Sequence, residues 1–286
     1  MPVAYLNGKF LPVAAARISP LDRGFLFADG VYEVIPVYAG RLFRPADHLR
    51  RLQSSLDGIR LQNPHDEAQW SMLLERLVRE NGGGYQALYL QVTRGTDTGR
   101  DHAFPQKTPP TVFAMASALD ELPAAIREHG VRAITLADIR WHRCDIKSVA
   151  LLGHVLLRQT ALEQHASEAI LLRDGHATEG SASNLFIVDA GVIVTPPKST
   201  DLLPGITRDL LLELAVSHGL AYRESRIPET QLHRAQEIWL SSSTREVYAV
   251  TELDGRGIGD GKPGPLWRCM YDYVQQYKTA LLSAAP

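Results

Sequence analysis

Cysteine is nearly absent from this sequence, since only Cys144 and Cys269 occur among 286 residues. Two cysteines cannot build the disulfide framework of a small secreted protein. No N-terminal stretch has the basic, apolar and small-residue segments of a secretory signal, so we expect a protein of the reducing cytoplasm. No apolar run reaches the roughly 18 residues that a membrane helix needs, and we expect no membrane partner.

A surplus of one charge is also missing, because 30 basic and 32 acidic residues leave a net charge of -2. Nucleic acids and anionic membranes attract basic proteins, so we expect neither as a partner. The 45% hydrophobic and 22% charged residues are typical of a globular protein. The length suffices for one large domain or two of ordinary size.

Several common motifs of ligand-binding enzymes are lacking as well. The sequence contains no G-x-x-x-x-G-K-[ST] phosphate loop, no H-E-x-x-H and no C-x-x-C. Its ten histidines are scattered without the spacing of metal ligands, so we expect no metal site.

Glycine-containing pairs between apolar stretches predict four hairpins. The predicted turns are Asn7-Gly8, Ala39-Gly40, Asp174-Gly175 and Ala190-Gly191. Apolar residues at helical spacing predict helices at 46–59, 68–81, 148–166, 205–219 and 266–282. A polar loop at 96–110 is longer than an ordinary connection, and such loops are often functional.

The pattern of elements resets around ALDELPAA, residues 118–125, where we place a domain boundary. The predicted domains are 1–118 and 124–286. Strands and helices mix without regular alternation, so we expect a two-domain α+β protein rather than a doubly wound sheet.

Lys147 stands in RCDIKSVALLGH, residues 143–154, at the start of an apolar run that should be buried. Burial of an ammonium group is costly, so such lysines either reach solvent or take part in chemistry. Lys147 could be a solvated residue after a strand. With the motifs above excluded, the chemical groups left in the sequence suit pyridoxal phosphate. This cofactor needs a lysine, an acidic partner for its pyridine nitrogen and a phosphate site.

Six segments follow one another along the chain: RGFLFADGVYEV, ADHLRRL, VTRGTDTGRDHAFP, DIRWHRCDIKSVALLG, TEGSASNLF and LLPGITRDLL. In order and spacing they resemble the fold-type IV pyridoxal-phosphate transaminases, and most closely the bacterial D-amino acid aminotransferases. The resemblance extends from the first hairpin to about Glu246. It implies an N-terminal domain with the phosphate-binding arginine and a substrate-carboxylate loop, and a C-terminal cofactor-binding domain with the Schiff-base lysine.

The resemblance implies roles for residues that would bind pyridoxal 5'-phosphate. Lys147 is the Schiff-base lysine and moves the proton, and Glu179 in TEGSASN keeps the pyridine nitrogen protonated. Arg51 binds the phosphate and is favoured over Arg50 by its register on the helix. The other implied cofactor contacts are Leu203 against the ring, Ile206 and Thr207 at a helix start that suits phosphate, and Ser243.

Tyr32, Arg100 and His102 match the residues that hold the substrate α-carboxylate in D-amino acid aminotransferases. The resemblance implies a homodimer in which Arg100 and His102 reach across from the other subunit. An arginine and a histidine two positions apart on an extended loop point the same way. The implied reaction is a ping-pong transfer of the amino group from a D-amino acid such as D-alanine to a 2-oxo acid. With 2-oxoglutarate as acceptor, the product is D-glutamate.

Two positions depart from the family pattern, because Ala182 and Ala150 replace a serine and an asparagine near the cofactor. We expect these changes to tune the rate or cofactor affinity. His48 is expected to act through the neighbouring Arg51, and Cys144 to be a small buried residue.

Three alternatives remain open at this point. One is a transaminase of the same fold that acts on (R)-amines or branched-chain L-amino acids, and another is an aminodeoxychorismate lyase. The third is a cofactor-binding or interaction protein without catalytic activity.

Overall fold

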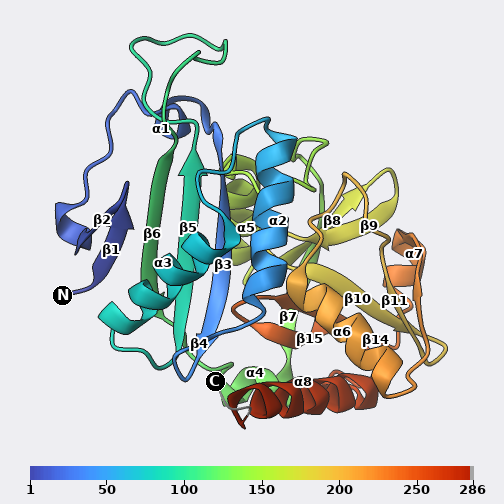
Figure 1. Ribbon diagram of the computed structural model, residues 1–286. Coiled ribbons are helices and arrows are strands. Elements are labelled where there is room, and N and C mark those ends of the chain that lie inside the picture. The colour runs from blue at the N-terminus through green and yellow to red at the C-terminus, as the bar shows by residue number, and fades with distance from the viewer. Residues whose placement is uncertain (284–286) are drawn as a thin grey trace. The chain divides into compact units, whose positions relative to one another are not determined.

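The structure is a computed structural model that describes residues 1–283, and within them the chain separates into two compact units (Figure 1). The first unit comprises Met1–Asp120 and Ile146–Leu151. The second comprises Glu121–Asp145 and resumes at Leu152. The last three residues of the domain predicted at 124–286 lie outside the described residues.

Residues 146–151 return to the first unit, so Lys147 lies there and not with the C-terminal residues to which sequence analysis assigned it. The amide of Tyr32 donates to the carbonyl of Lys147 at 2.9 Å. The amide of Lys147 donates to Oγ of Ser55 at 3.1 Å. Ser148 forms a β-bridge with Val31. These partners are distant in sequence, so local sequence patterns did not reveal that residues 146–151 belong to the first unit.

The first unit contains a six-stranded antiparallel sheet within the described residues, in the order β2-β1-β6-β5-β3-β4. The strands are β1 (Val3–Leu6), β2 (Lys9–Pro12), β3 (Gly30–Tyr38), β4 (Arg41–Leu42), β5 (Gln86–Thr93) and β6 (Thr111–Ala118). The helical segments are η1 (Val13–Ala15), α1 (Arg23–Phe27), α2 (Pro45–Gly58) and α3 (Glu67–Glu80). Figure 1 shows α2 and α3 against this sheet, with the long loop between β5 and β6 near α1.

The hydrophobic core of the first unit joins the sheet to α2 and α3. Leu52 and Leu56 of α2 and Leu74 of α3 are fully buried against strand residues such as Ile35 and Leu88. The apolar residues recur every three or four positions along both helices, which directs one face of each toward the core. The predicted helices at 46–59 and 68–81 are therefore confirmed.

The second unit contains a mixed ten-stranded sheet within the described residues, in the order β12-β11-β10-β14-β15-β7-β8-β9-β13, with β16 beside β15. The strands are β7 (Val131–Ala137), β8 (Glu168–Arg173), β9 (His176–Gly180), β10 (Asn184–Asp189), β11 (Val192–Thr195), β12 (Tyr222–Glu224), β13 (Ile227–Pro228), β14 (Glu237–Ser242), β15 (Glu246–Leu253) and β16 (Arg256–Gly257). The helices are α4 (Ala124–His129), α5 (Leu152–Glu163), α6 (Ile206–Ser217), α7 (Glu229–Leu232) and α8 (Pro265–Ser283). Strands and helices of both units mix irregularly, so the predicted α+β class is confirmed.

All four predicted hairpin turns are present, and both residues of each turn have positive φ angles. Asn7 has φ 46° and Gly8 has φ 90°, for example. Two successive residues with positive φ are the mark of the type I′ turn, whose twist matches that of paired strands. The glycine avoids the steric cost of this backbone conformation.

The helix predicted at 148–166 starts later and is less buried than expected. Helix α5 begins at Leu152, because Ser148 forms a bridge with Val31 and the amide of Val149 donates to the carbonyl of Gly30. Only Leu157 and Ala161 of this helix are buried, whereas Leu152 is 72% exposed. Apolar residues occupy more than one face of α5, and only one face packs on β8.

Within residues 1–283, no helix is long and apolar enough to cross a membrane. In the same residues no group of three or more His, Cys, Asp and Glu side chains is arranged to hold a metal ion.

Candidate active site

The candidate residues belong to both units, and each unit holds its own set. Tyr32, Arg51, Arg100, His102 and Lys147 lie in the first unit, and Glu179, Leu203, Ile206, Thr207 and Ser243 lie in the second.

Lys147 is half-buried, and its Nζ lies 4.3 Å from the centroid of the Tyr32 ring. Tyr32 in turn stacks on Tyr89, with ring centroids 5.6 Å apart. Burial raises the pKa of Tyr89 to about 12, so this ring stays neutral. Lys147 has no ion pair among the described residues, so its amine is stabilised by an aromatic face and not by a carboxylate. The amide and the carbonyl of Lys147 both form hydrogen bonds, and these fix the position of its backbone.

Arg51 is held by a buried carboxylate that sequence analysis did not identify. Nε and Nη2 of Arg51 donate to the two oxygens of Glu33, each at 2.8 Å. Nδ1 of His48 lies 2.8 Å from Oε2 of the same carboxylate. Burial alone would raise the pKa of Glu33, but the Arg51 guanidinium outweighs it and holds this pKa well below the usual value. Burial keeps the pKa of His48 low, so a neutral imidazole donates to Glu33 from Nδ1.

The register of α2 places Arg51 on the buried face of the helix and Arg50 on the exposed face, as predicted. The side chain of Arg51 is 6% exposed, whereas that of Arg50 is 73% exposed and pairs with Asp47. Glu33 lies next to Tyr32 on β3, and successive residues of a strand point to opposite faces. The same strand therefore directs Tyr32 toward Lys147 and Glu33 toward α2.

Arg100 and His102 lie on the exposed loop between β5 and β6, and both are gathered around Phe27 of α1. Cζ of Arg100 lies 5.2 Å from the Phe27 ring centroid. The His102 ring centroid lies 5.1 Å from it. Arg100 has no ion pair within residues 1–283, so its charge is available to an anion. Both side chains contact the same ring, and their convergence on a substrate carboxylate stays a prediction.

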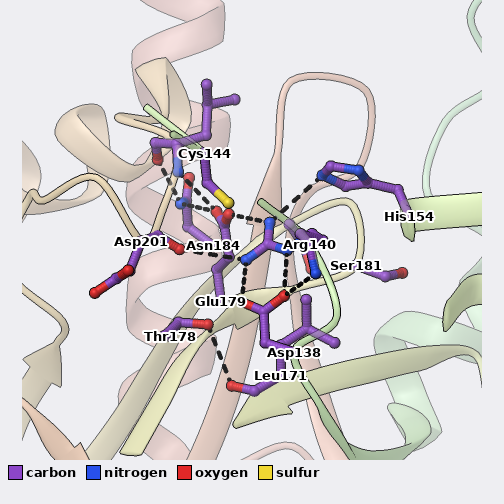
Figure 2. A network of polar contacts seen from close by, with 12 residues as sticks. Asp138, Arg140, Cys144, His154, Leu171, Thr178, Glu179, Ser181, Asn184 and Asp201 are labelled. Carbon is purple, nitrogen blue, oxygen red and sulfur yellow. Dashed lines mark hydrogen bonds and ion pairs between the residues drawn. The ribbon is translucent and has the colours of Figure 1, made fainter. Parts of the chain in front are cut away.

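Glu179 of β9 is 4% exposed and accepts three hydrogen bonds within the second unit (Figure 2). Nη1 of Arg140 donates at 2.5 Å, Nδ2 of Asn184 at 3.1 Å and the amide of Leu203 at 3.1 Å. Three fixed donors leave the carboxylate one well-defined orientation. This is the property required of a group that must face one ring nitrogen.

Arg140 bridges two buried carboxylates and donates two hydrogen bonds to Asp138 but only one to Glu179 (Figure 2). Nε and Nη2 of Arg140 donate to the two oxygens of Asp138, each at 2.9 Å, so only Nη1 remains for Glu179. Burial would raise the pKa of Asp138, but the hydrogen bonds from Arg140 lower it. Burial raises the pKa of Glu179, and the interaction with Arg140 lowers it by a smaller amount, so this pKa stays above the usual value. Glu179 is therefore the more basic carboxylate of the two.

The start of α6 is fixed to Glu179 through Asn184. Nδ2 of Asn184 also donates to the carbonyl of Leu203 at 2.8 Å. A Cβ atom on Gly205, which caps α6, would lie 1.9 Å from Oδ1 of Asn184, so only glycine fits. Ile206 and Thr207 follow in the first turn and are each 7% exposed. Helix N-termini carry free N–H groups that suit phosphate.

Four further positions from the sequence analysis show different degrees of burial. Ser243 is half-buried in the turn between β14 and β15. Ala150 and Ala182, the two departures from the family pattern, are exposed. Cys144 is 5% exposed and burial raises the pKa of its thiol, as expected for a small buried residue.

Arg140, Asp138, Glu33 and Asn184 were not singled out from the sequence. Asp138 and Arg140 follow β7 with one residue between them, and this alternation was the available signal. Buried ion pairs are formed by residues from distant segments, so the sequence did not reveal which partners they have. An amine, an arginine, a basic carboxylate and a helix N-terminus are the kinds of group that pyridoxal phosphate needs.

Comparison with known proteins gives a consistent picture. Residues 30–253 match the family model for amino-transferase class IV. The chain is 42% identical to the D-alanine aminotransferase of Bacillus licheniformis, over 94% of each protein. It is 38% identical to that of Staphylococcus aureus, over 97% of this chain and 98% of the relative. The branched-chain amino acid aminotransferase of T.th., solved with pyridoxamine 5'-phosphate, superimposes with a TM-score of 0.89 at 27% identity, over 96% of this chain and 93% of that one.

Proposed function

The chain belongs to the amino-transferase class IV family, and we propose that it is a pyridoxal-phosphate-dependent D-amino acid transaminase. The observation that carries this proposal is the pair of Arg100 and His102 around Phe27, with no acidic partner for Arg100 in residues 1–283. A cation with free N–H donors beside an imidazole suits the α-carboxylate of an amino acid. A substrate without a carboxylate would leave this pair without a partner.

Pyridoxal phosphate, when bound, withdraws electrons from the Cα–H bond of the amino acid and thereby makes that proton acidic. We assign Lys147 as the Schiff-base lysine and as the base that removes this proton. Its amine has no ion pair in the described residues, so no salt bridge holds it away from the cofactor. Glu179 keeps a proton on the pyridine nitrogen, and its raised pKa and fixed orientation support this role.

The remaining residues would bind and orient the cofactor. We assign Arg51, held rigid by Glu33, as a phosphate ligand. The N-terminus of α6 at Ile206 and Thr207 offers N–H groups of the kind that bind phosphate. Ser243 adds a hydroxyl donor to the phosphate, and Leu203 packs on the ring. Tyr32 joins Arg100 and His102 in holding the substrate carboxylate.

The reaction is a ping-pong transfer in two halves. A D-amino acid such as D-alanine gives up its amino group and leaves as a 2-oxo acid. A second 2-oxo acid, such as 2-oxoglutarate, then accepts the amino group and leaves as D-glutamate. Both substrates carry an α-carboxylate, so one pair of residues, Arg100 and His102, serves both halves.

We further propose a homodimer in the cytoplasm, with Arg100 and His102 contributed across the subunit interface. Four apolar side chains of α5 support an interface, since Leu152, Val155, Leu156 and Leu162 are each at least 48% exposed. Both cysteines are free, as in a reducing compartment. Sedimentation velocity should show a dimer, and Val155→Glu should shift it toward the monomer if α5 lies in the interface.

A steady-state assay tests the proposed activity. The purified protein with pyridoxal phosphate should convert D-alanine and 2-oxoglutarate to pyruvate and D-glutamate, and L-alanine should give a far lower rate. A preference for L-leucine would favour a branched-chain transaminase. The solved branched-chain enzyme is similar in structure, but its sequence identity of 27% is lower than the 42% of the D-alanine relative. Pyruvate released from aminodeoxychorismate without an amino acceptor would favour a lyase.

A further inference from the structure

A buried arginine outside the groups assigned above supports the loop that carries Arg100 and His102. Arg23 is the first residue of α1 and is 3% exposed. Its Nη1 donates to the carbonyl of Asp101 at 2.6 Å, and its Nη2 donates to the carbonyl of His102 at 3.2 Å. One guanidinium therefore binds the carbonyls of Asp101 and His102, the residue between the two proposed carboxylate-binding residues and the second of that pair.

The guanidinium of Arg23 is itself fixed by an acidic residue. Nε of Arg23 donates to Oδ2 of Asp29 at 2.9 Å. Arg94 contacts both oxygens of Asp29, at 2.8 and 3.0 Å. Burial would raise the pKa of Asp29, but these arginines lower it, so Asp29 stays charged. Arg94 also lies 3.7 Å from the Phe104 ring centroid, which gives the loop a second point of support.

The two ends of the loop are fixed without any contribution from the Arg23 side chain. Asp22 accepts hydrogen bonds from Oγ1 of Thr93 at 2.8 Å and from Oγ1 of Thr111 at 2.6 Å. Thr93 ends β5 and Thr111 begins β6, so Asp22 joins the two stems of the loop. Removal of the Arg23 side chain would therefore loosen residues 100–102 while the stems stay in place.

Phe27 sets the direction of the two side chains. Its ring centroid lies 4.8 Å from Cζ of Arg23 and 5.2 Å from Cζ of Arg100, with the His102 ring 5.1 Å away. An aromatic face holds a cation without occupying its N–H donors as a carboxylate would. The backbone is thus fixed by Arg23 and the side chains by Phe27.

We propose that Arg23 and Phe27 are positioning residues that preorganise Arg100 and His102 for the α-carboxylate of the substrate. They act through the loop, which they contact directly. The inference rests on the proposed function and deepens it, because it places the determinant of carboxylate recognition in α1. Preorganisation avoids the cost of ordering two long side chains and their backbone when the substrate binds.

The test compares Arg23→Met with Arg17→Met, an exposed arginine that also donates to two backbone carbonyls, those of Ala14 and Ala16. Arg23→Met should raise KM for D-alanine about fivefold to a hundredfold, the range for ordering two side chains. kcat should change less, and turnover of an (R)-amine without a carboxylate should be unchanged relative to wild type. Phe27→Leu, at a half-buried position, should also raise KM, and Arg23→Lys should lie between wild type and Arg23→Met.

Limited trypsin digestion of the cofactor-free proteins provides a readout apart from activity. Cleavage after Arg100 should accelerate in Arg23→Met and not in Arg17→Met. An unchanged KM in Arg23→Met and Phe27→Leu, with normal turnover of D-alanine by the wild type, would overturn the positioning role alone. A wild-type protein that does not act on D-alanine would overturn the proposed function and this inference with it.

Discussion

Nη1 of Arg140 donates a 2.5 Å hydrogen bond to Oε1 of Glu179, and both side chains are almost completely buried. The other edge of the guanidinium binds Asp138 at two points. A buried charge without a partner is costly, so the three groups are interdependent. The orientation of Glu179 thus depends on a residue that sequence analysis did not select.

We expect Arg140→Gln to lower the free energy of unfolding by about 3–5 kcal/mol, the cost of breaking a buried ion pair by removing one partner. Glu179 would keep only its contacts with Asn184 and Leu203, and its pKa would rise further. Urea denaturation measures the loss of stability. Dialysis against cofactor-free buffer should show weaker retention of pyridoxal phosphate.

The matched control for that variant is Arg143→Gln. Arg143 pairs with Asp145 close by in sequence, but its side chain is 47% exposed. Solvent screens such pairs, so stability should hardly change. Equal losses in the two variants would contradict the role of the buried network.

Replacement of Lys147 by alanine should abolish activity and leave the fold intact. The backbone contacts of residue 147 with Tyr32 and Ser55 do not involve the side chain. We expect a fall in rate of at least about 10²–10⁴-fold, the range for losing a general acid–base group. The thermal midpoint should stay within about 2 °C of the wild type.

Borohydride reduction locates the covalent attachment independently of turnover. Mass spectrometry of the reduced wild-type protein should find the cofactor on the peptide that contains Lys147. The exposed Lys262→Ala should behave like the wild type. Labelling of another lysine in the wild type would contradict the assignment.

Arg100→Met should reduce kcat/KM for D-alanine by roughly 10- to 150-fold, the equivalent of about 1.5–3 kcal/mol for a charged hydrogen bond. Arg100 is exposed on its loop, so stability should not change. Turnover of an (R)-amine without a carboxylate should be preserved. Arg79→Met, an exposed helical arginine, controls for the loss of charge. Equal losses for both substrates would refute carboxylate recognition by Arg100.

The ion pair of Glu33 with Arg51 predicts a pH-dependent stability difference between wild type and Glu33→Gln. The pKa of Glu33 is lower in the folded protein than its ordinary value of 4.5. Its contribution is therefore fully present above pH 4.5 and is lost as the pH falls toward the folded-state pKa. The difference between the two thermal midpoints should shrink as the pH falls from neutral to about pH 3.5.

The exposed pair of Arg76 with Glu80 offers the control for that experiment. Glu80→Gln should differ little from wild type at any pH, because the pair is screened by solvent. A constant difference between wild type and Glu33→Gln across this range would show that Glu33 does not titrate as the structure implies.

Much of the fold could be predicted from local patterns. The hairpin at Asn7-Gly8 follows from residues that tolerate positive φ, and the register of α2 follows from the spacing of its leucines. The return of residues 146–151 to the first unit could not be predicted, because it depends on pairing with β3 more than a hundred residues earlier. The same distant pairing delays the start of α5.

The candidate site was only partly accessible to sequence reasoning. Lys147 and Glu179 stand in segments that resemble a known family, so their proposed roles come with the pattern. Arg23 and Glu33 also stand in such a segment, RGFLFADGVYEV, but no role was assigned to them, since each is an ordinary charged residue until burial gives it a partner. Burial and ion pairing are properties of the folded chain, and they identify the residues that hold the reactive groups in place.

The most direct test of the central claim is to follow the visible absorption of the cofactor-loaded protein as single substrates are added. D-alanine should remove the long-wavelength band, 2-oxoglutarate should restore it, and neither L-alanine nor an (R)-amine without a carboxylate should act at comparable speed. Loss of the band with L-alanine as readily as with D-alanine would contradict the proposed D-amino acid specificity. Loss of the band with the amine as readily as with D-alanine would contradict carboxylate recognition by Arg100 and His102.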